Sequence, residues 1–230
     1  MLMKRCFGSS WIFFWCIAVF GQSDSLIVQN SKPVDQGRYR DIDGSPYYFR
    51  DWVKGSILRS DGKVIDNVMV NYNGYAHEME VRSGEKIYAL DKRWHLRVDV
   101  FRDQNPNLAD QFPASQLIFQ RGAHRDLADK YATILFLGEQ LTLIRDCDIG
   151  KVQKEFNDVG KTISILRFKD LSNYYLKRSG ALIPLKLQKK RIAEAFDNDP
   201  RIVDFLTKEK LDLNNESDLV QLFMYADTLK

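Results

Sequence analysis

From Pro46 onward the chain alternates between short apolar runs and polar turns that contain glycine. Asn-Gly, Asp-Gly and Gly-X pairs between strand-like runs are the strongest local signal for β-hairpins. Such turns occur at SDGK, YNGY, RSGE, LGEQ and RSGA, which begin at residues 60, 72, 82, 137 and 178. KTISILRFKDL and NYYLKRSGALIPLKL continue the β pattern. The chain is therefore predicted to be mainly β, with antiparallel hairpins and meanders in which residues 46–121 and 122–230 can form two β-rich halves.

The stretch NVMVNYNGYAHEMEVRSGEKIYAL, residues 67–90, allows the register of two hairpins to be predicted. If Asn73-Gly74 is a two-residue loop, side-chain alternation gives one mainly apolar face and one mostly polar face. The pairs on the apolar face are then Tyr72 with Tyr75, Val70 with His77 and Val68 with Met79. A second turn at Ser83-Gly84 continues the same faces. The stretch is interpreted as sheet architecture rather than as a binding site.

The period of the pattern changes near the C-terminus. Asp199 followed by Pro200 is typical of a helix start, because an N-cap precedes proline at the first helical position. Asn215 predicts a second N-cap. The apolar stripe of the helix that follows consists of Leu219, Leu222, Phe223 and Ala226. The expected class is α+β, with two or three short helices closing residues 122–230. Pro184 predicts that its strand lies at a sheet edge or ends at this proline.

The first 21 residues have the pattern of an export signal. Lys4 and Arg5 precede WIFFWCIAVF, an apolar run too short to span a bilayer, and small residues precede Gln22. This predicts a signal peptide over residues 1–21 and a location in the periplasm, at the outer membrane or outside the cell. An uncleaved anchor or a buried helix is the alternative. Residues 22–45 are predicted to be an extended lead-in, and no transmembrane span is expected after signal removal.

Loss of this signal changes the charge and the cysteine count. The full chain has 34 basic and 31 acidic residues, of which 32 and 31 remain, because the signal holds two basic residues and no acidic one. Balanced charge gives no electrostatic reason to expect nucleic acid as a partner. Cys6 and Cys16 leave with the signal, so Cys147 has no intramolecular disulfide partner. The fold must depend on its hydrophobic core.

One histidine lies where a reactive group is often found. His124 occupies a polar loop with Asp126 and Asp129 close in sequence, and loops carry function disproportionately. Most polar loops have no such role, however, and no catalytic residue is assigned. These three residues are the candidates for a hydrolase.

The other reactive side chains are interpreted as structural. His77 has apolar neighbours on its predicted face, and His95 shares a charged, solvated face with Arg97 and Asp99. Cys147 lies between two aspartates, which would raise its pKa and make it a poor nucleophile. A small, partly buried residue is the expected role of this cysteine.

The sequence gives no support for a metal or a cofactor. It contains no GxSxG, P-loop, HExxH, CxxC pair or dinucleotide fingerprint. Asp41 and Asp43 precede a glycine, but EF-hand spacing would put Tyr39 first and Arg50 last, which excludes an EF-hand. An irregular calcium site and a carboxylate-only glycosidase remain open alternatives. No metal and no cofactor are predicted.

Two long stretches of the chain resemble a known group of proteins. GSPYYFRDWVKGSILRSDGKVIDNVMVNYNGYAHEMEV, with IYALD after it, contains a Pro-Tyr-x-Phe-x-x-Trp-x-x-Gly pattern, then DGK, an NYN strand and a closing Leu-Asp. The back half adds a tyrosine hairpin, paired lysines before a short helix, and a final E-x-D-L helix. Together they are similar to a group of secreted proteins from Bacteroidetes-type bacteria. The resemblance implies export and a two-part β arrangement, and it brings no catalytic residues.

These observations lead us to expect an exported, non-catalytic envelope protein that binds another envelope protein or a ligand. Exposed aromatic residues anchor interfaces, although aromatic side chains also fill cores. The predicted binding residues are Tyr47, Tyr48, Trp52, Tyr174 and Tyr175. One alternative is a periplasmic carrier or chaperone for a lipid or another apolar small molecule, and a second is a hydrolase that uses His124. No oligomeric state is predicted.

Overall fold

A computed structural model describes residues 31–108, 115–158 and 161–229. The predicted signal peptide over residues 1–21 and the start of the lead-in lie outside the described residues. Within them the protein is mainly β, with thirteen strands and three α-helices. The strands are β1 (Ser31–Pro33), β2 (Val53–Arg59), β3 (Val64–Asn73), β4 (Glu78–Ser83), β5 (Lys86–Leu90), β6 (His95–Phe101), β7 (Gln116–Arg121), β8 (Tyr131–Leu137), β9 (Leu141–Asp146), β10 (Ile149–Asp158), β11 (Lys161–Asp170), β12 (Asn173–Arg178) and β13 (Ala181–Leu185). The helices are α2 (Lys189–Ala195), α3 (Pro200–Lys208) and α4 (Glu216–Asp227), with short 3-10 turns η1 (Pro106–Leu108) and η2 (Arg125–Leu127).

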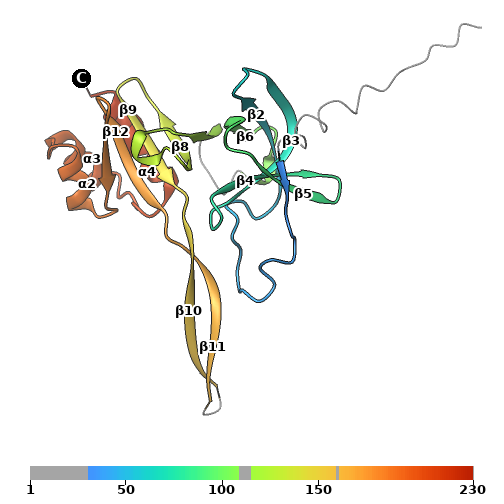
Figure 1. Cartoon of the computed structure of the whole chain (residues 1–230). Helices are drawn as coiled ribbons and strands as arrows, with labels where there is room; N and C mark the ends of the chain where they lie inside the picture. Colours follow the sequence, from blue (N-terminus) through green and yellow to red (C-terminus); the bar gives the residue numbers. More distant parts are fainter. Residues whose placement is uncertain (1–30, 109–114, 159–160, 230) are drawn as a thin grey trace, which may run out of the picture.

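Eleven of these strands form one antiparallel sheet, in the order β1-β5-β4-β3-β2-β6-β7-β8-β9-β12-β13. Most neighbours are consecutive in sequence, which confirms the predicted hairpins and meander, and the sheet runs through the whole body of the molecule (Figure 1). β7 pairs with β8, so one sheet joins residues 46–121 to residues 122–230. Pro184 lies in the edge strand β13, as predicted. Proline is tolerated in an edge strand because no neighbouring strand on the open side needs its missing N–H.

The three helices lie together at the C-terminal end of this sheet (Figure 1). α4 packs on β8 and β9, and α3 contacts both α2 and α4. Both predicted N-caps are confirmed, because the side chain of Asp199 accepts from Arg201 N–H and that of Asn215 accepts from Ser217 N–H. The predicted stripe of α4 is buried at Leu219, Leu222, Phe223 and Ala226. Local capping and periodicity therefore define this end of the molecule.

The register predicted for residues 67–90 is wrong, whereas its division into faces is right. The loop between β3 and β4 contains four residues, because Asn73 Oδ1 accepts from the N–H groups of Tyr75 and Ala76 and closes a longer turn. The observed pairs are Tyr72 with Met79, Val70 with Val81 and Ser83 with Lys86. Each observed partner lies an even number of residues away from the predicted one. Side chains two positions apart point to the same face, so the predicted faces are kept. His77 lies in the turn, with φ 53°, and not in a strand.

The polar face of β3 and β4 is buried under the lead-in. Asn71, Asn73 and Glu80 are each at most 2% exposed. Asn71 exchanges hydrogen bonds with the backbone of Phe49, at 3.1 and 3.0 Å. Glu80 accepts from Arg38, from Tyr47 Oη at 2.9 Å and from Asn73 Nδ2 at 2.9 Å. Asn71 and Glu80 therefore fix Phe49, Tyr47 and the lead-in residue Arg38 onto the sheet, where buried polar groups require partners.

His95 is fully buried, which corrects the prediction of a solvated face. Leu58 pairs with Arg97 but Arg59 pairs with His95, so Leu96 is an extra residue in β6. A bulge of this kind reverses the faces on one side of it. His95 turns inward and Leu96 is 37% exposed. The His95 ring is fixed by a 2.9 Å contact between Nδ1 and the backbone oxygen of Asp91.

Candidate functional site

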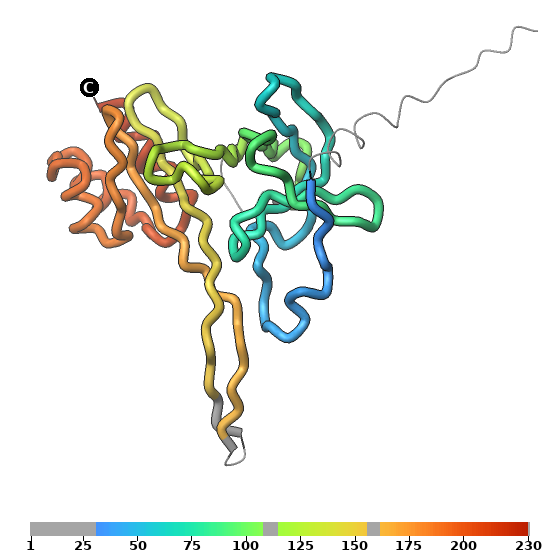
Figure 2. The backbone as a smooth tube through the Cα atoms, in the orientation of Figure 1, coloured from blue at the N-terminus to red at the C-terminus, as the bar shows by residue number. Residues whose placement is uncertain are grey.

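β10 and β11 form a two-stranded arm that leaves the body between β9 and β12. Ten residue pairs join its strands, from Ile149 with Asp170 to Asp158 with Lys161. β9 and β12 pair directly with each other, with Asp146 opposite Asn173. The arm therefore projects from the sheet rather than extending it (Figures 1 and 2). Residues 149–170 are called the arm below.

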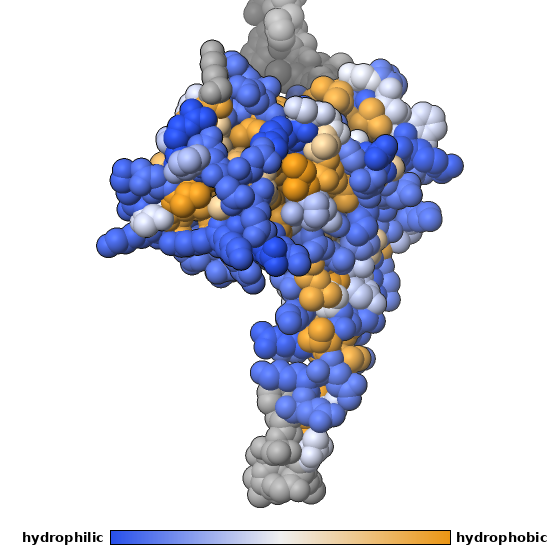
Figure 3. Space-filling model, turned by 90° about the vertical axis from the view of Figure 1, so that its left-hand side faces the viewer, coloured by the Kyte–Doolittle hydropathy of each residue, from blue (hydrophilic) through white to orange (hydrophobic). Residues whose placement is uncertain are grey.

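Apolar side chains remain exposed along this arm. The register places Val152, Ile163 and Ile165 on one face and Leu166 on the other. Ile163 is 45% exposed and Leu166 is 47% exposed, and Figure 3 shows hydrophobic residues along the arm between hydrophilic ones. A two-stranded ribbon is at best marginally stable in water without a further packing surface. The arm is therefore suited to burying these side chains against another molecule.

The sequence pattern predicted only half of the arm. KTISILRFKDL was recognised as β-like and is β11, whereas β10 was not predicted. β10 is IGKVQKEFND, in which charged and polar residues interrupt the apolar alternation. The signal that could have found the arm is TISIL, residues 162–166, an uncharged run that needs a pairing partner.

Backbone contacts hold the base of the arm on both edges. On the β11 side, Asp43 N–H donates to the Leu166 carbonyl and the Asp43 carbonyl accepts from Phe168 N–H, both at 2.9 Å. On the β10 side, Ile149 N–H donates to the Gly74 carbonyl at 3.3 Å. A Cβ at Gly74 would lie 2.8 Å from Ile149 Cγ1, so glycine permits this approach. The rings of Tyr39, Tyr75 and Phe168 pack together nearby, with centroids 5.3–5.7 Å apart.

Arg145 links the base of the arm to α4. Its Nη2 donates to Asp170 Oδ2 and its Nη1 to Glu216 Oε1, both at 2.5 Å. The guanidinium also lies 4.9 Å from the Tyr48 ring centroid and 5.7 Å from that of Tyr174. Burial lowers the pKa of Arg145, but the surrounding groups, among them Tyr48 and Glu216, raise it above its ordinary value. Arg145 thus stays charged and fixes the arm to the helical end of the molecule.

The five predicted binding residues are half-buried and engaged within the protein. Tyr48 and Tyr174 meet at Arg145, and Tyr174 Oη donates to Glu216 at 2.8 Å. Tyr47 donates to Glu80, and its ring lies 6.1 Å from that of Trp52. Burial, together with the charge of Glu80, raises the pKa of Tyr47 to about 12. Tyr175 points to the other face of β12, where it packs against a cluster of Ala123, Leu127, Ala132 and Ile144.

The hydrolase candidates are brought together only in part. His124 is the N-cap of η2, where its Nδ1 accepts from Asp126 N–H at 3.2 Å and lies 3.4 Å from Asp126 Oδ2. Asp129 instead contributes its backbone oxygen to Lys92 Nζ, at 3.2 Å. The His124–Asp126 contact is between near neighbours in sequence and closes a turn.

Cys147 is enclosed rather than reactive. It is 2% exposed, and its Sγ lies 3.0 Å from Thr133 Oγ1. Burial raises the pKa of this thiol to about 12, which keeps it protonated at neutral pH. Within the described ranges, no group of three or more His, Cys, Asp or Glu residues could hold a metal ion. In the same ranges, no helix combines the length and the apolar character needed to cross a membrane.

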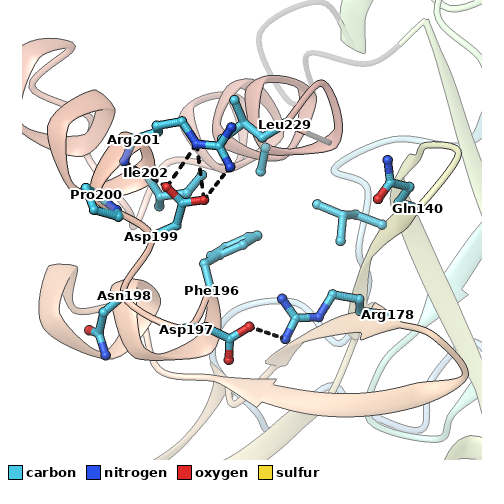
Figure 4. A pocket seen from close by; sticks show the side chains of 12 residues that line it. Gln140, Arg178, Phe196, Asp197, Asn198, Asp199, Pro200, Arg201, Ile202 and Leu229 are labelled. Carbon is cyan, nitrogen blue, oxygen red and sulfur yellow. Dashed lines mark hydrogen bonds and ion pairs between the residues drawn. The ribbon is translucent and has the colours of Figure 1, made fainter.

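A groove of about 630 Å³ lies between the helices and the end of the sheet. Its floor includes the buried side chains of Leu141, Phe196 and Ile202. Two ion pairs lie at its rim, Arg178 with Asp197 at 2.8 Å and Arg201 with Asp199 at 2.7 Å (Figure 4). Because each arginine is already paired with an aspartate, the groove presents an apolar floor and a balanced rim.

Comparison with known proteins finds no family model, curated protein or solved structure that matches this chain. The functional assignment therefore rests on the geometry of the chain itself.

Proposed function

We propose that this protein is an exported, non-catalytic binding protein of the bacterial envelope, which engages another polypeptide through its arm. The observation that carries the proposal is the exposure of Ile163 and Leu166, near one half each, on a hairpin that projects from the body. The backbone hydrogen bonds that tie the arm to the rest of the described chain join Gly74 to Ile149 and Asp43 to Leu166 and Phe168.

A partner can bury the apolar side chains that this chain leaves exposed to water on the arm. Complete burial of an isoleucine or leucine side chain contributes roughly 1.5–3 kcal/mol, so covering the exposed half of each contributes on the order of 1 kcal/mol. Several such side chains along one arm suffice for a specific contact when the base is rigid. The Arg145 ion pairs and the bridges at Asp43 and Gly74 provide that rigidity. Export is supported by the pattern of residues 1–21.

The direct test is site-specific photo-crosslinking in the protein's own host. A photoreactive amino acid is placed at Ile163 in the full chain, and the matched control carries it at Val203 in α3, which is 43% exposed against 45% for Ile163. We expect a discrete crosslinked polypeptide from position 163 and not from position 203. Equal products from both positions, or none from position 163, would contradict the proposal.

A second candidate is a carrier of a small apolar molecule, and the groove at the helical end favours it. Ligand sites are concave and combine apolar walls with polar groups that orient the ligand, and this groove has both in its floor and rim. Organic extraction of purified protein, followed by mass spectrometry, should release one molecular species. Leu229→Arg at the rim should reduce its amount at least fivefold, whereas an empty wild-type extract would rule this function out.

A further inference from the structure

We propose that a partner adds a strand to the open edge of β11, and that the added segment is an extended polypeptide carrying acidic residues. This inference rests on the proposed function, because it specifies how the arm binds and what chemistry it selects.

The backbone of β11 identifies the open edge. Alternate residues of a strand direct their N–H and C=O groups to one side. Leu166 C=O and Phe168 N–H bond Asp43 and therefore point away from β10, and so do the backbone groups of Ser164. Asp43 forms a parallel bridge with Arg167. Beyond it, no backbone group of the described chain continues along the edge beside Ser164. A strand position is thus occupied at Asp43 and open beside Ser164.

The two edges of the arm are not equivalent. The outward-facing residues of β10 are Lys151, Gln153 and Glu155, and charged side chains, lysine above all, discourage strand addition. β11 presents TISIL, residues 162–166, with no charge and with three β-branched residues. Sequences of this kind pair readily when their edge is exposed. The β11 edge is therefore the one that accepts a partner.

Charge indicates the chemistry of the partner. Among the described side chains of the arm, Lys151, Lys154, Arg167 and Lys169 are accompanied by two acids, Glu155 and Asp170, and Asp170 is already paired with Arg145. The one residue already on the β11 edge is acidic, and the Asp43 carboxylate lies 3.7 Å from Arg167 Nε. An incoming strand with acidic residues is attracted by the excess of cations on the arm, whereas a second copy of the arm brings the same cations.

The open edge also favours a polypeptide over a membrane. A lipid core provides no partners for backbone N–H and C=O groups, and each unsatisfied group there costs several kcal/mol. A partner strand satisfies the outward groups of Ser164 and the N–H of Leu166 directly. Recognition by strand addition combines such main-chain bonds with side-chain pockets.

Two proline variants separate the edges. Ser164→Pro removes an outward N–H of β11, and Gln153→Pro removes an outward N–H of β10, so neither removes a bond between the two strands.

The probe is a synthetic peptide of alternating valine and threonine with glutamate at both ends. With the full chain, we expect it to bind and to slow hydrogen exchange of the Ser164 amide at least tenfold. Ser164→Pro should weaken its Kd at least tenfold, and Gln153→Pro less than twofold. A lysine-ended version of the peptide should bind at least tenfold more weakly.

Other results overturn the inference. Equal loss in both proline variants, or unchanged exchange at Ser164, shows that the β11 edge does not accept the strand. Arm-dependent dimers in sedimentation without peptide assign the edge to a second copy. Binding to phosphatidylglycerol vesicles that survives Ser164→Pro assigns the arm to a membrane. A crosslink from position 163 that persists in Ser164→Pro removes only the edge proposal, whereas its absence in the wild type removes the proposed function.

Discussion

Asp227, the last residue of α4, occupies the space beside Gly138 that a side chain would need. Its Oδ2 accepts from Glu139 N–H at 2.8 Å, and its Oδ1 accepts from the N–H groups of Gln140 and Leu141 at 2.9 and 2.8 Å. A Cβ at Gly138 would collide with this carboxylate. One side chain therefore caps the β8–β9 turn and attaches the final helix to it.

Gly138→Ala should lower the free energy of unfolding by about 1–3 kcal/mol, because the added methyl group displaces the Asp227 carboxylate. Urea unfolding measures this cost. In an Asp227→Ala background the same change should cost clearly less, since the collision is gone and the two residues are in contact. Strict additivity of the two substitutions would show that the residues are not coupled.

The stability contributed by Asp227 should depend on pH. Burial raises the pKa of Asp227, but its three backbone hydrogen bonds together lower the pKa by more than burial raises it. The folded pKa therefore lies below 3.8. The unfolded chain then binds more protons, so this contribution is fully present above pH 3.8 and is lost as the pH falls through the folded pKa. The difference in unfolding free energy between wild type and Asp227→Asn should shrink below pH 3.8. A difference that stays constant from pH 7 to pH 2 would contradict this assignment.

Glu78 and Glu80 form a matched pair, because both lie near Arg38 and they differ in burial. The Glu80 side chain is 0% exposed and the Glu78 side chain is 35% exposed. Glu80→Ala leaves Arg38 without its buried partner and should cost about 3–5 kcal/mol. Glu78→Ala should cost less than about 1 kcal/mol. Urea unfolding of both variants gives the comparison, and equal costs would refute the buried network beneath the lead-in.

Cys147 should be nearly inert in the folded protein. Burial raises its pKa to about 12, and reaction with a disulfide reagent requires an accessible thiolate. In a chain with Cys6 and Cys16 replaced by alanine, labelling at pH 8 should be at least about a hundredfold slower in buffer than in 8 M urea. Comparable rates in the two solvents would mean that the thiol is reachable in the native state.

Local signals predicted much of the fold. Glycine turns identified the hairpins, and the N-caps at Asp199 and Asn215 located α3 and α4 because capping depends on neighbouring residues. The β3–β4 register was missed because Asn73 closes a longer turn with its side chain. The alternation of apolar residues does not reveal the hydrogen bonds that the Asn73 side chain accepts.

Long-range polar contacts explain the other differences. Glu80 appeared to belong to a simple polar face because its partner Arg38 is 42 residues away in sequence. β10 was not predicted for the opposite reason, since a hairpin without a core to pack on needs no regular apolar stripe. Tyr48 and Tyr174 were chosen from composition, and only the fold shows that both surround Arg145.

The direct pairing of β9 with β12 makes the arm a self-contained insertion. The ladder of the sheet closes beneath it, with Asp146 opposite Asn173. The arm beyond its contacts at Ile149, Leu166 and Phe168 can therefore diverge or change length while the ladder on either side is preserved. Such a chain can acquire a new partner by exchanging one loop, in the way that an antibody domain changes specificity without rebuilding its framework.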